Sequence, residues 1–131
     1  DYRGTVVSLG AEDMFQPGRA DLRPTVWPFL DDLLDLAVEH RALVSVEAHT
    51  DGTPINSARF PTNDHLSAGR GLAVLRYMKG ARPELTDERL EVVPRGDTRP
   101  RTVNSSAAQR RKNRRVELVF SATPQDFRPR N

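Results

Sequence analysis

The segment LVSVEAHTDGTPINSARFPTNDHLSAGRGLAVLRYMK, residues 43–79, changes its hydrophobic period along its length. Residues 43–49 alternate between apolar and polar side chains, as expected of a β-strand. Residues 50–62 are mostly polar and contain one glycine and two prolines, a composition typical of a loop. Apolar side chains then recur at helical spacing over residues 63–79. The candidates for the N-cap of this helix are Thr62, Asn63 and Asp64.

The strand-like and helix-like spacings of apolar residues also occur in the rest of the chain. Strands are expected at residues 5–9, 90–93 and 115–120, helices near residues 26–39 and at 105–112, and a loop at 94–104. Two long helices that alternate with short strands favour a two-layer α/β sandwich, with both helices on one face of a four-stranded sheet. A doubly wound Rossmann sheet is not expected, because no G-x-G-x-x-G follows a strand.

The composition indicates a single domain. A chain of 131 residues can bury one core, and we expect the domain to span residues 1–121, followed by a flexible tail at residues 122–131. The absence of cysteine excludes disulfides and thiolate zinc sites. No apolar run approaches the roughly 20 residues that cross a bilayer. Any membrane anchor of the parent protein is therefore expected outside this sequence.

Two charged residues stand where a site could form. The helix stripe that should face the sheet consists of Leu66, Arg70, Val74 and Met78. Burying the Arg70 guanidinium without a partner is costly, so Arg70 must reach the edge of the core or meet an anion. Asp51 follows the preceding strand, in the kind of crevice where α/β proteins hold ligands. The two side chains could hold a zwitterionic ligand between them, or they could bridge each other.

Other kinds of site are less well supported by the sequence. The histidines, His40, His49 and His65, are expected at the surface or in loops, and no set of three ligands has metal-binding spacing. No nucleophile motif such as G-x-S-x-G occurs, so we expect no enzyme activity. The basic run at residues 109–115 is the main feature favouring a nucleic-acid partner. Few aromatic residues accompany it, and no nucleic acid is expected.

Three ordered motifs in the sequence resemble one known family. They are VEAHTDGTPI (residues 46–55), RFPTNDHLSAGRGLAVLRYM (59–78) and QRRKNRRVELVF (109–120). Together they are similar to the OmpA-like peptidoglycan-binding domain, and the resemblance covers residues 3 to 121. The R-F-P-x-N insertion favours the MotB branch of flagellar stators over the OmpA and Pal branches.

The resemblance implies a fold, a location and a ligand. The fold would be βαβαβ(α)β with a four-stranded mixed sheet, and the domain would lie in the periplasm. It would bind the peptidoglycan stem peptide without a cofactor. In the family, the aspartate of the His-Thr-Asp motif holds the ammonium of diaminopimelate, and the arginine of the Leu-Ser-x-x-Arg motif holds its carboxylate. The matching residues in this sequence are Asp51 and Arg70. Further residues that would line the site are Phe15, Thr50, Asn63 and Leu66, with Arg114 as a secondary candidate.

The resemblance also implies partners for the parent protein. Stator subunits of this type form homodimers, are anchored in the inner membrane and assemble with a stator partner subunit. The alternative within the family is an OmpA- or Pal-type anchor, or a cell-wall anchor of a secretion system.

The sequence departs from the family pattern at several positions, including Ala48, where glycine is usual, and the loop at residues 94–97. Two further departures lie near the expected site. Gln16 stands where an aspartate commonly follows Phe15, which removes one charge near the expected site. Gly71 replaces the usual alanine and is expected to weaken its helix by up to about 1 kcal/mol.

Overall fold

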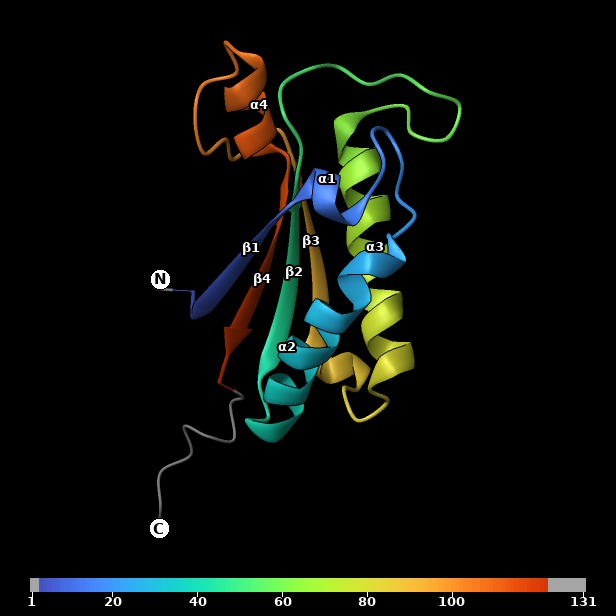
Figure 1. Ribbon diagram of the computed structural model, residues 1–131, viewed down its shortest axis with the longest axis vertical. Helices are drawn as coiled ribbons and strands as arrows, with labels where there is room; N and C mark the ends of the chain where they lie inside the picture. Colours follow the sequence, from blue (N-terminus) through green and yellow to red (C-terminus); the bar gives the residue numbers. More distant parts are fainter. Residues whose placement is uncertain (1–2, 123–131) are drawn as a thin grey trace.

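The structure is a computed structural model that describes residues 3–122 (Figure 1). Its strands are β1 (Thr5–Gly10), β2 (Leu43–His49), β3 (Leu90–Gly96) and β4 (Arg115–Ser121). Its helices are α1 (Ala11–Met14), α2 (Trp27–Glu39), α3 (Asn63–Ala81) and α4 (Ala107–Asn113), with 3-10 turns at Pro24–Val26 and Asp87–Arg89. The predicted tail, residues 122–131, lies outside the described residues apart from Ala122.

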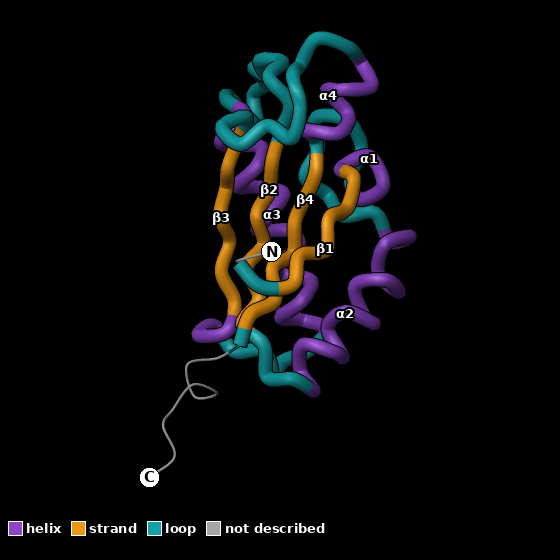
Figure 2. Tube along the Cα trace, turned by 90° about the vertical axis from the view of Figure 1, so that its left-hand side faces the viewer, coloured by secondary structure: helices purple, strands orange, loops and turns teal. Residues whose placement is uncertain are grey.

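The strands form one mixed sheet in the order β1-β4-β2-β3. β4 is antiparallel to both β1 and β2, whereas β2 and β3 are parallel. Helices α2 and α3 lie on the same side of this sheet (Figures 1 and 2). The two-layer architecture predicted from the sequence is therefore confirmed.

A main hydrophobic core fills the space between the sheet and the helices, and a smaller cluster includes Leu66 near the start of α3. The predicted apolar stripe of α3 is buried, including Arg70 at 4% exposure. The α2 stripe contributes Leu30, Leu34 and Ala37, and the central strands contribute Val44, Val46, Val116 and Leu118. Alternation along β2 and β4 thus places most of their apolar residues against the helices, and their charged residues lie on the helix-free face.

Most element boundaries agree with the predictions, and the largest error is at β3. This strand continues through Pro94 to Gly96, so the predicted end at residue 93 is wrong. Proline is tolerated there because β3 is an edge strand that pairs only with β2. The short basic helix begins at Ala107 rather than residue 105, because the Ser106 hydroxyl caps it by accepting from the Gln109 N–H at 3.1 Å.

Gly71 has a packing role that the sequence did not indicate. A Cβ at this position would collide with Cγ1 of Val92 on β3. The glycine therefore lets α3 approach the sheet closely, a packing role in addition to the expected loss of helix propensity.

None of the helices described between residues 3 and 122 combines the length and apolar character needed to span a bilayer.

Candidate functional site

A cleft of about 310 Å³ lies where β2 ends and α3 begins. Figure 1 shows α1, the start of α3 and α4 gathered at this end of the sheet. All the residues singled out from the sequence line this cleft: Phe15, Thr50, Asp51, Asn63, Leu66, Arg70 and Arg114. The structure therefore brings together side chains that are up to about a hundred residues apart in the chain.

The backbone around the cleft is held by hydrogen bonds between its elements. The Thr50 N–H donates to the Gly96 carbonyl at 2.8 Å, which joins the end of β2 to the end of β3. Helix α3 is capped by Thr62, whose hydroxyl accepts from the His65 N–H at 3.3 Å. The Asn63 amide donates to the Thr53 carbonyl at 3.1 Å. This bond fixes the start of α3 against the loop that carries Asp51.

Arg70 is held at one side of the cleft by the loop that follows α1. Its Nε donates to the Arg19 carbonyl at 2.8 Å and its Nη2 to the Gln16 carbonyl at 3.4 Å. Its guanidinium lies 5.0 Å from the centre of the Phe15 ring. Burial lowers the pKa of Arg70 to about 10, and the charge of Glu12 opposes this shift. Arg70 therefore remains a cation at neutral pH.

Asp51 is held at another side by a different set of partners. Its Oδ2 accepts from Nη1 of Arg114 at 2.6 Å, and its Oδ1 accepts from the Thr53 N–H at 2.8 Å. Within residues 3–122, no ion pair joins Asp51 to Arg70. The sequence left open whether these two residues bridge each other, and the structure keeps them separate.

Glu12 is a residue of the cleft that the sequence analysis missed. Its Oε1 accepts from Nε of Arg114 at 2.6 Å, so Arg114 lies between two carboxylates. Its buried Oε2 has no hydrogen-bond partner in the part of the chain that the structure describes, but it lies 3.8 Å from Nε of the exposed Arg111. The only available signal was an acidic residue near Phe15, because α1 is too short to show a hydrophobic period.

The charges of the cleft are therefore divided into two groups. Among the residues that line the cleft, Asp51, Glu12 and Arg114 together carry a formal charge of −1, and Arg70 carries +1 on its own. The exposed Arg111, which lies outside the cleft, is not included in this sum. A ligand with one ammonium and one carboxylate would complement both groups, because each ligand charge could meet a charge of opposite sign.

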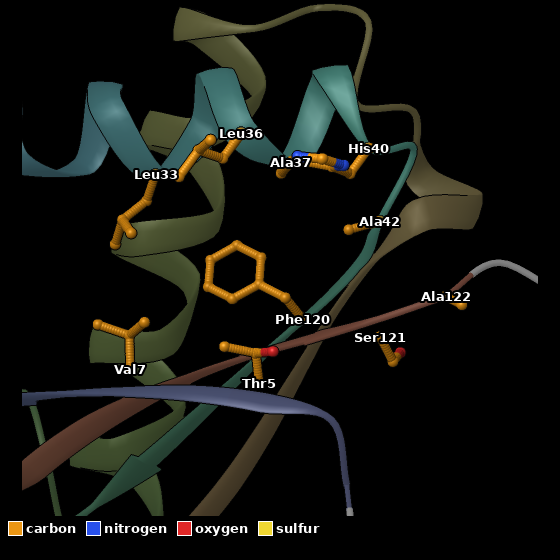
Figure 3. Close-up of a pocket in the computed structure, with 10 residues that line it drawn as sticks. All are labelled: Thr5, Val7, Leu33, Leu36, Ala37, His40, Ala42, Phe120, Ser121 and Ala122. Atoms are coloured by element: carbon orange, nitrogen blue, oxygen red, sulfur yellow. The ribbon is translucent and has the colours of Figure 1, made fainter.

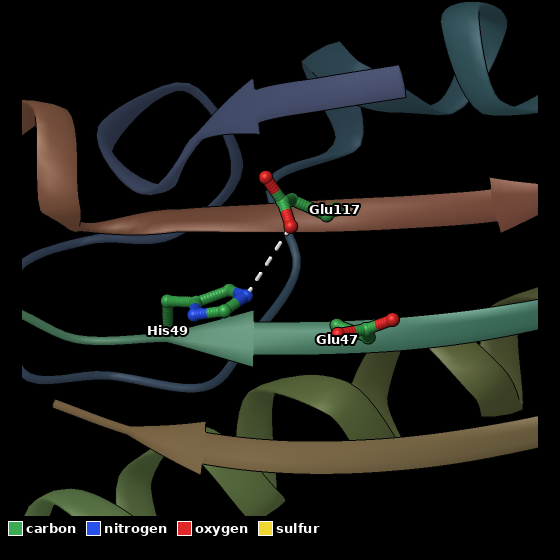
Figure 4. A group of neighbouring side chains, drawn as sticks. All are labelled: Glu47, His49 and Glu117. Atoms are coloured by element: carbon green, nitrogen blue, oxygen red, sulfur yellow. Dashed lines mark ion pairs between the residues drawn. The ribbon is translucent and has the colours of Figure 1, made fainter. Parts of the chain in front are cut away.

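A second polar cluster, formed by Glu47, His49 and Glu117, lies on the helix-free face of the sheet (Figure 4). His49 is 4% exposed, so its predicted surface position is wrong. Its Nε2 lies 3.5 Å from Oε1 of Glu117, and ligand atoms of Glu47, His49 and Glu117 lie within 4.8 Å of one another. Burial lowers the pKa of His49 to about 4, and the neighbouring Arg115 contributes to this shift.

Arginines already occupy the two carboxylates of this cluster. Glu117 pairs with Arg3, Arg101 and Arg115 at 3.1–3.2 Å. Glu47 pairs with Arg3 at 3.3 Å and with Arg95 at 3.2 Å. Four guanidinium groups therefore surround two carboxylates, an arrangement that disfavours a bound metal cation.

An apolar groove of about 390 Å³ separates α2 from the edge formed by β1 and β4 (Figure 3). Leu33, Leu36 and Phe120 line it, and among residues 3–122 His40 is its only ionisable side chain. It cannot supply the two opposite charges that the sequence predicts for the site.

The comparisons with known proteins agree with this architecture. The OmpA family model matches residues 14–114. Motility protein B of Helicobacter pylori is 27% identical over 130 residues, which are 95% of this chain and 49% of that protein. The chain spans about half the length of the curated relatives it matches.

Two solved structures are similar in both sequence and fold. A MotB-like protein from Desulfovibrio vulgaris is 32% identical with a TM-score of 0.83, and the match covers 90% of this chain and 75% of that one. The cell wall anchor of the T6SS from Pseudomonas aeruginosa is 32% identical with a TM-score of 0.79, and the match covers 88% of this chain and 80% of that one. The family match includes the cleft residues from Phe15 to Arg114, and the chain belongs to the OmpA family.

Proposed function

We propose that this domain binds peptidoglycan through the cleft and thereby anchors its parent protein to the cell wall in the periplasm. The observation that carries the proposal is the separation of Asp51 and Arg70, which line one cleft without pairing with each other. Membership of the OmpA family supports it. So does the similarity to a protein described as a cell wall anchor.

The ligand that fits this charge distribution is the diaminopimelate residue of the stem peptide. Its side-chain ammonium would lie near Asp51 and Glu12, where the excess charge is negative. Its side-chain carboxylate would accept hydrogen bonds from the Arg70 guanidinium, which backbone carbonyls hold in place. The domain would act by binding alone, without catalysis.

The finer assignment is to a MotB-like flagellar stator. The R-F-P-x-N insertion and the similarity to Motility protein B support it. The parent protein would then be a homodimer, anchored in the inner membrane by a segment outside this sequence and assembled with a stator partner subunit. A secretion-system anchor is the second candidate, because the T6SS protein is as similar in sequence as the MotB-like protein.

Co-sedimentation with purified sacculi tests the proposal. Asp51→Asn and Arg70→Gln should each weaken binding by about 2–5 kcal/mol, because each leaves a ligand charge without its counterpart. Asp32→Asn, at an exposed position of α2, is the matched control and should bind like the parent. Thermal unfolding should verify that each variant is folded.

Sacculi with a different stem peptide test the same site, because they change the ligand instead of the protein. Sacculi with lysine in place of diaminopimelate lack the carboxylate proposed to meet Arg70, and we expect them to bind the parent domain much more weakly. Equal binding to both walls, or folded Asp51 and Arg70 variants that bind like the parent, would refute the proposal.

A further inference from the structure

A second groove, of about 370 Å³, lies beside the candidate cleft on the other flank of α3. The two hollows share a wall, the small apolar cluster of Ala20, Phe60 and Leu66. Ala20 and Phe60 line the groove, whereas Leu66 lines the cleft. The helix itself also faces both hollows, because the consecutive residues Gly69 and Arg70 line the groove and the cleft respectively.

A stacked aromatic pair, the exposed Trp27 and the partly buried Tyr77, lines this groove. The rings of Trp27 and Tyr77 stack with their centres 5.6 Å apart and an interplanar angle of 18°. The Tyr77 hydroxyl donates to Asp31 at 2.6 Å, which fixes the ring at the junction of α2 and α3. Trp27 is nevertheless 43% exposed. A large aromatic surface that is held rigid and left open to solvent is typical of a binding site.

Charged side chains complete the groove. The Arg59 guanidinium lies 5.4 Å from the centre of the Phe60 ring and forms an exposed ion pair with Asp21 at 3.5 Å. Arg76 lines the same groove from α3. The groove therefore combines flat apolar surface with hydrogen-bond donors and acceptors at its rim.

We propose that this groove binds the glycan strand of peptidoglycan. A pyranose ring presents an apolar C–H face that can pack on an aromatic ring, while its hydroxyl and N-acetyl groups need polar partners such as Asp21, Arg59 and Arg76. A purely apolar peptide would shield these charged groups from water without offering them hydrogen bonds. The choice of polymer rests on the proposed function, since the glycan and the stem peptide belong to one molecule and the two hollows adjoin.

The single tryptophan of the chain provides a direct assay, because Trp27 lies in the groove. Peptide-free glycan strands, prepared by amidase digestion of sacculi, should change the Trp27 fluorescence in a saturable manner. A soluble tripeptide that contains diaminopimelate should bind with little change in fluorescence, because the cleft lies across the apolar cluster.

Variants on both sides of the groove sharpen the test. Trp27→Ala should raise the Kd for glycan strands about tenfold, which corresponds to about 1.4 kcal/mol, and Arg76→Ala should weaken binding while leaving the ring pair intact. Both should bind the tripeptide like the parent. The matched control is Phe29→Ala, because Phe29 is on the same helix, is 45% exposed and lies outside the groove.

The outcomes for the groove and for the cleft can be distinguished. If calorimetry detects no binding of glycan strands by the parent, or if Trp27→Ala and Arg76→Ala bind them as tightly as the parent does, the groove proposal is overturned. Tripeptide binding would then still report on the cleft. Glycan binding that depends on Trp27 supports the groove even if the tripeptide fails to bind.

Discussion

The buried imidazole of His49 should make the stability of the domain depend on pH between about pH 4 and pH 6.5. In the folded protein, burial lowers the pKa of His49 to about 4 from its ordinary value of 6.5. Between these values the unfolded chain binds a proton that the folded chain does not bind. The free energy of unfolding therefore falls as the pH is lowered through this range.

The size of the effect follows from the two pKa values. Each unit of difference is equivalent to about 1.36 kcal/mol, so the domain should lose about 2 kcal/mol between pH 8 and pH 5. The loss should approach about 3 kcal/mol below pH 4. Charges from several elements face the ring: Arg3, Glu47, Arg95, Arg115 and Glu117.

Glu117 contributes in a lower pH range. Burial favours a higher pKa for this carboxyl, but hydrogen bonds from Arg3 and Arg115 outweigh it and lower the pKa below 4.5. The stability that Glu117 contributes is therefore present above pH 4.5 and is lost as the pH falls below it. Measurements above pH 5 separate the effect of His49 from that of Glu117.

Urea unfolding at pH 8 and pH 5, monitored by fluorescence, measures the difference. His49→Asn should remove about 2 kcal/mol of the pH dependence, whereas His40→Asn, at an exposed histidine, should leave it unchanged. An NMR titration gives an independent test, since the His49 ring signals should shift only slightly between pH 8 and pH 5, with most of the change below pH 5. A parent protein that is equally stable at both pH values, or an unchanged pH dependence in His49→Asn, would refute this reasoning.

Three further substitutions test other features of the structure. Glu12→Gln should weaken binding of the diaminopimelate tripeptide in calorimetry, since Arg114 would then neutralise Asp51 alone; unchanged affinity would exclude Glu12 from the acidic group. Gly71→Ala should destabilise the domain by about 1–3 kcal/mol in urea unfolding, because the added methyl would collide with β3; stabilisation would contradict this packing argument. Thr62→Ala should cost about 1 kcal/mol by removing the α3 cap, and Thr62→Ser should restore most of it.

The elements that were predicted well are those whose signals are local. The alternation of β2 and the stripe of α3 depend on side chains only a few residues apart, and both bounds of β2 are confirmed. Asp51 and Arg70 could be placed in one crevice because the end of a strand and the start of the next helix must adjoin. The position of the crevice could therefore be predicted from the order of the elements. The hydrogen-bond partners of Asp51 and Arg70 could not be predicted in this way.

The features that were missed depend on contacts between distant segments. Arg114 meets Glu12 across 102 positions of the sequence, and α1 gave no periodic signal. Glu47 and His49 occupy the polar face of β2, as the alternation predicts. They are nevertheless buried, and arginines from other segments pair with Glu47 and act on His49. No pattern within β2 contains that information.

Helix α3 packs against the sheet and also lines two hollows at the surface. Its buried stripe, Leu66, Val74 and Met78, packs toward the sheet. Arg70 breaks that stripe near the end where β2 stops, and the broken position opens into the cleft. Gly69, only one residue away, lets Phe60 pack against the helix, since a Cβ there would lie 2.8 Å from the Phe60 ring. Phe60 then separates the charged cleft from the aromatic groove. The two positions that make this segment a poorer amphipathic helix are therefore the ones at which α3 borders the cleft and the groove.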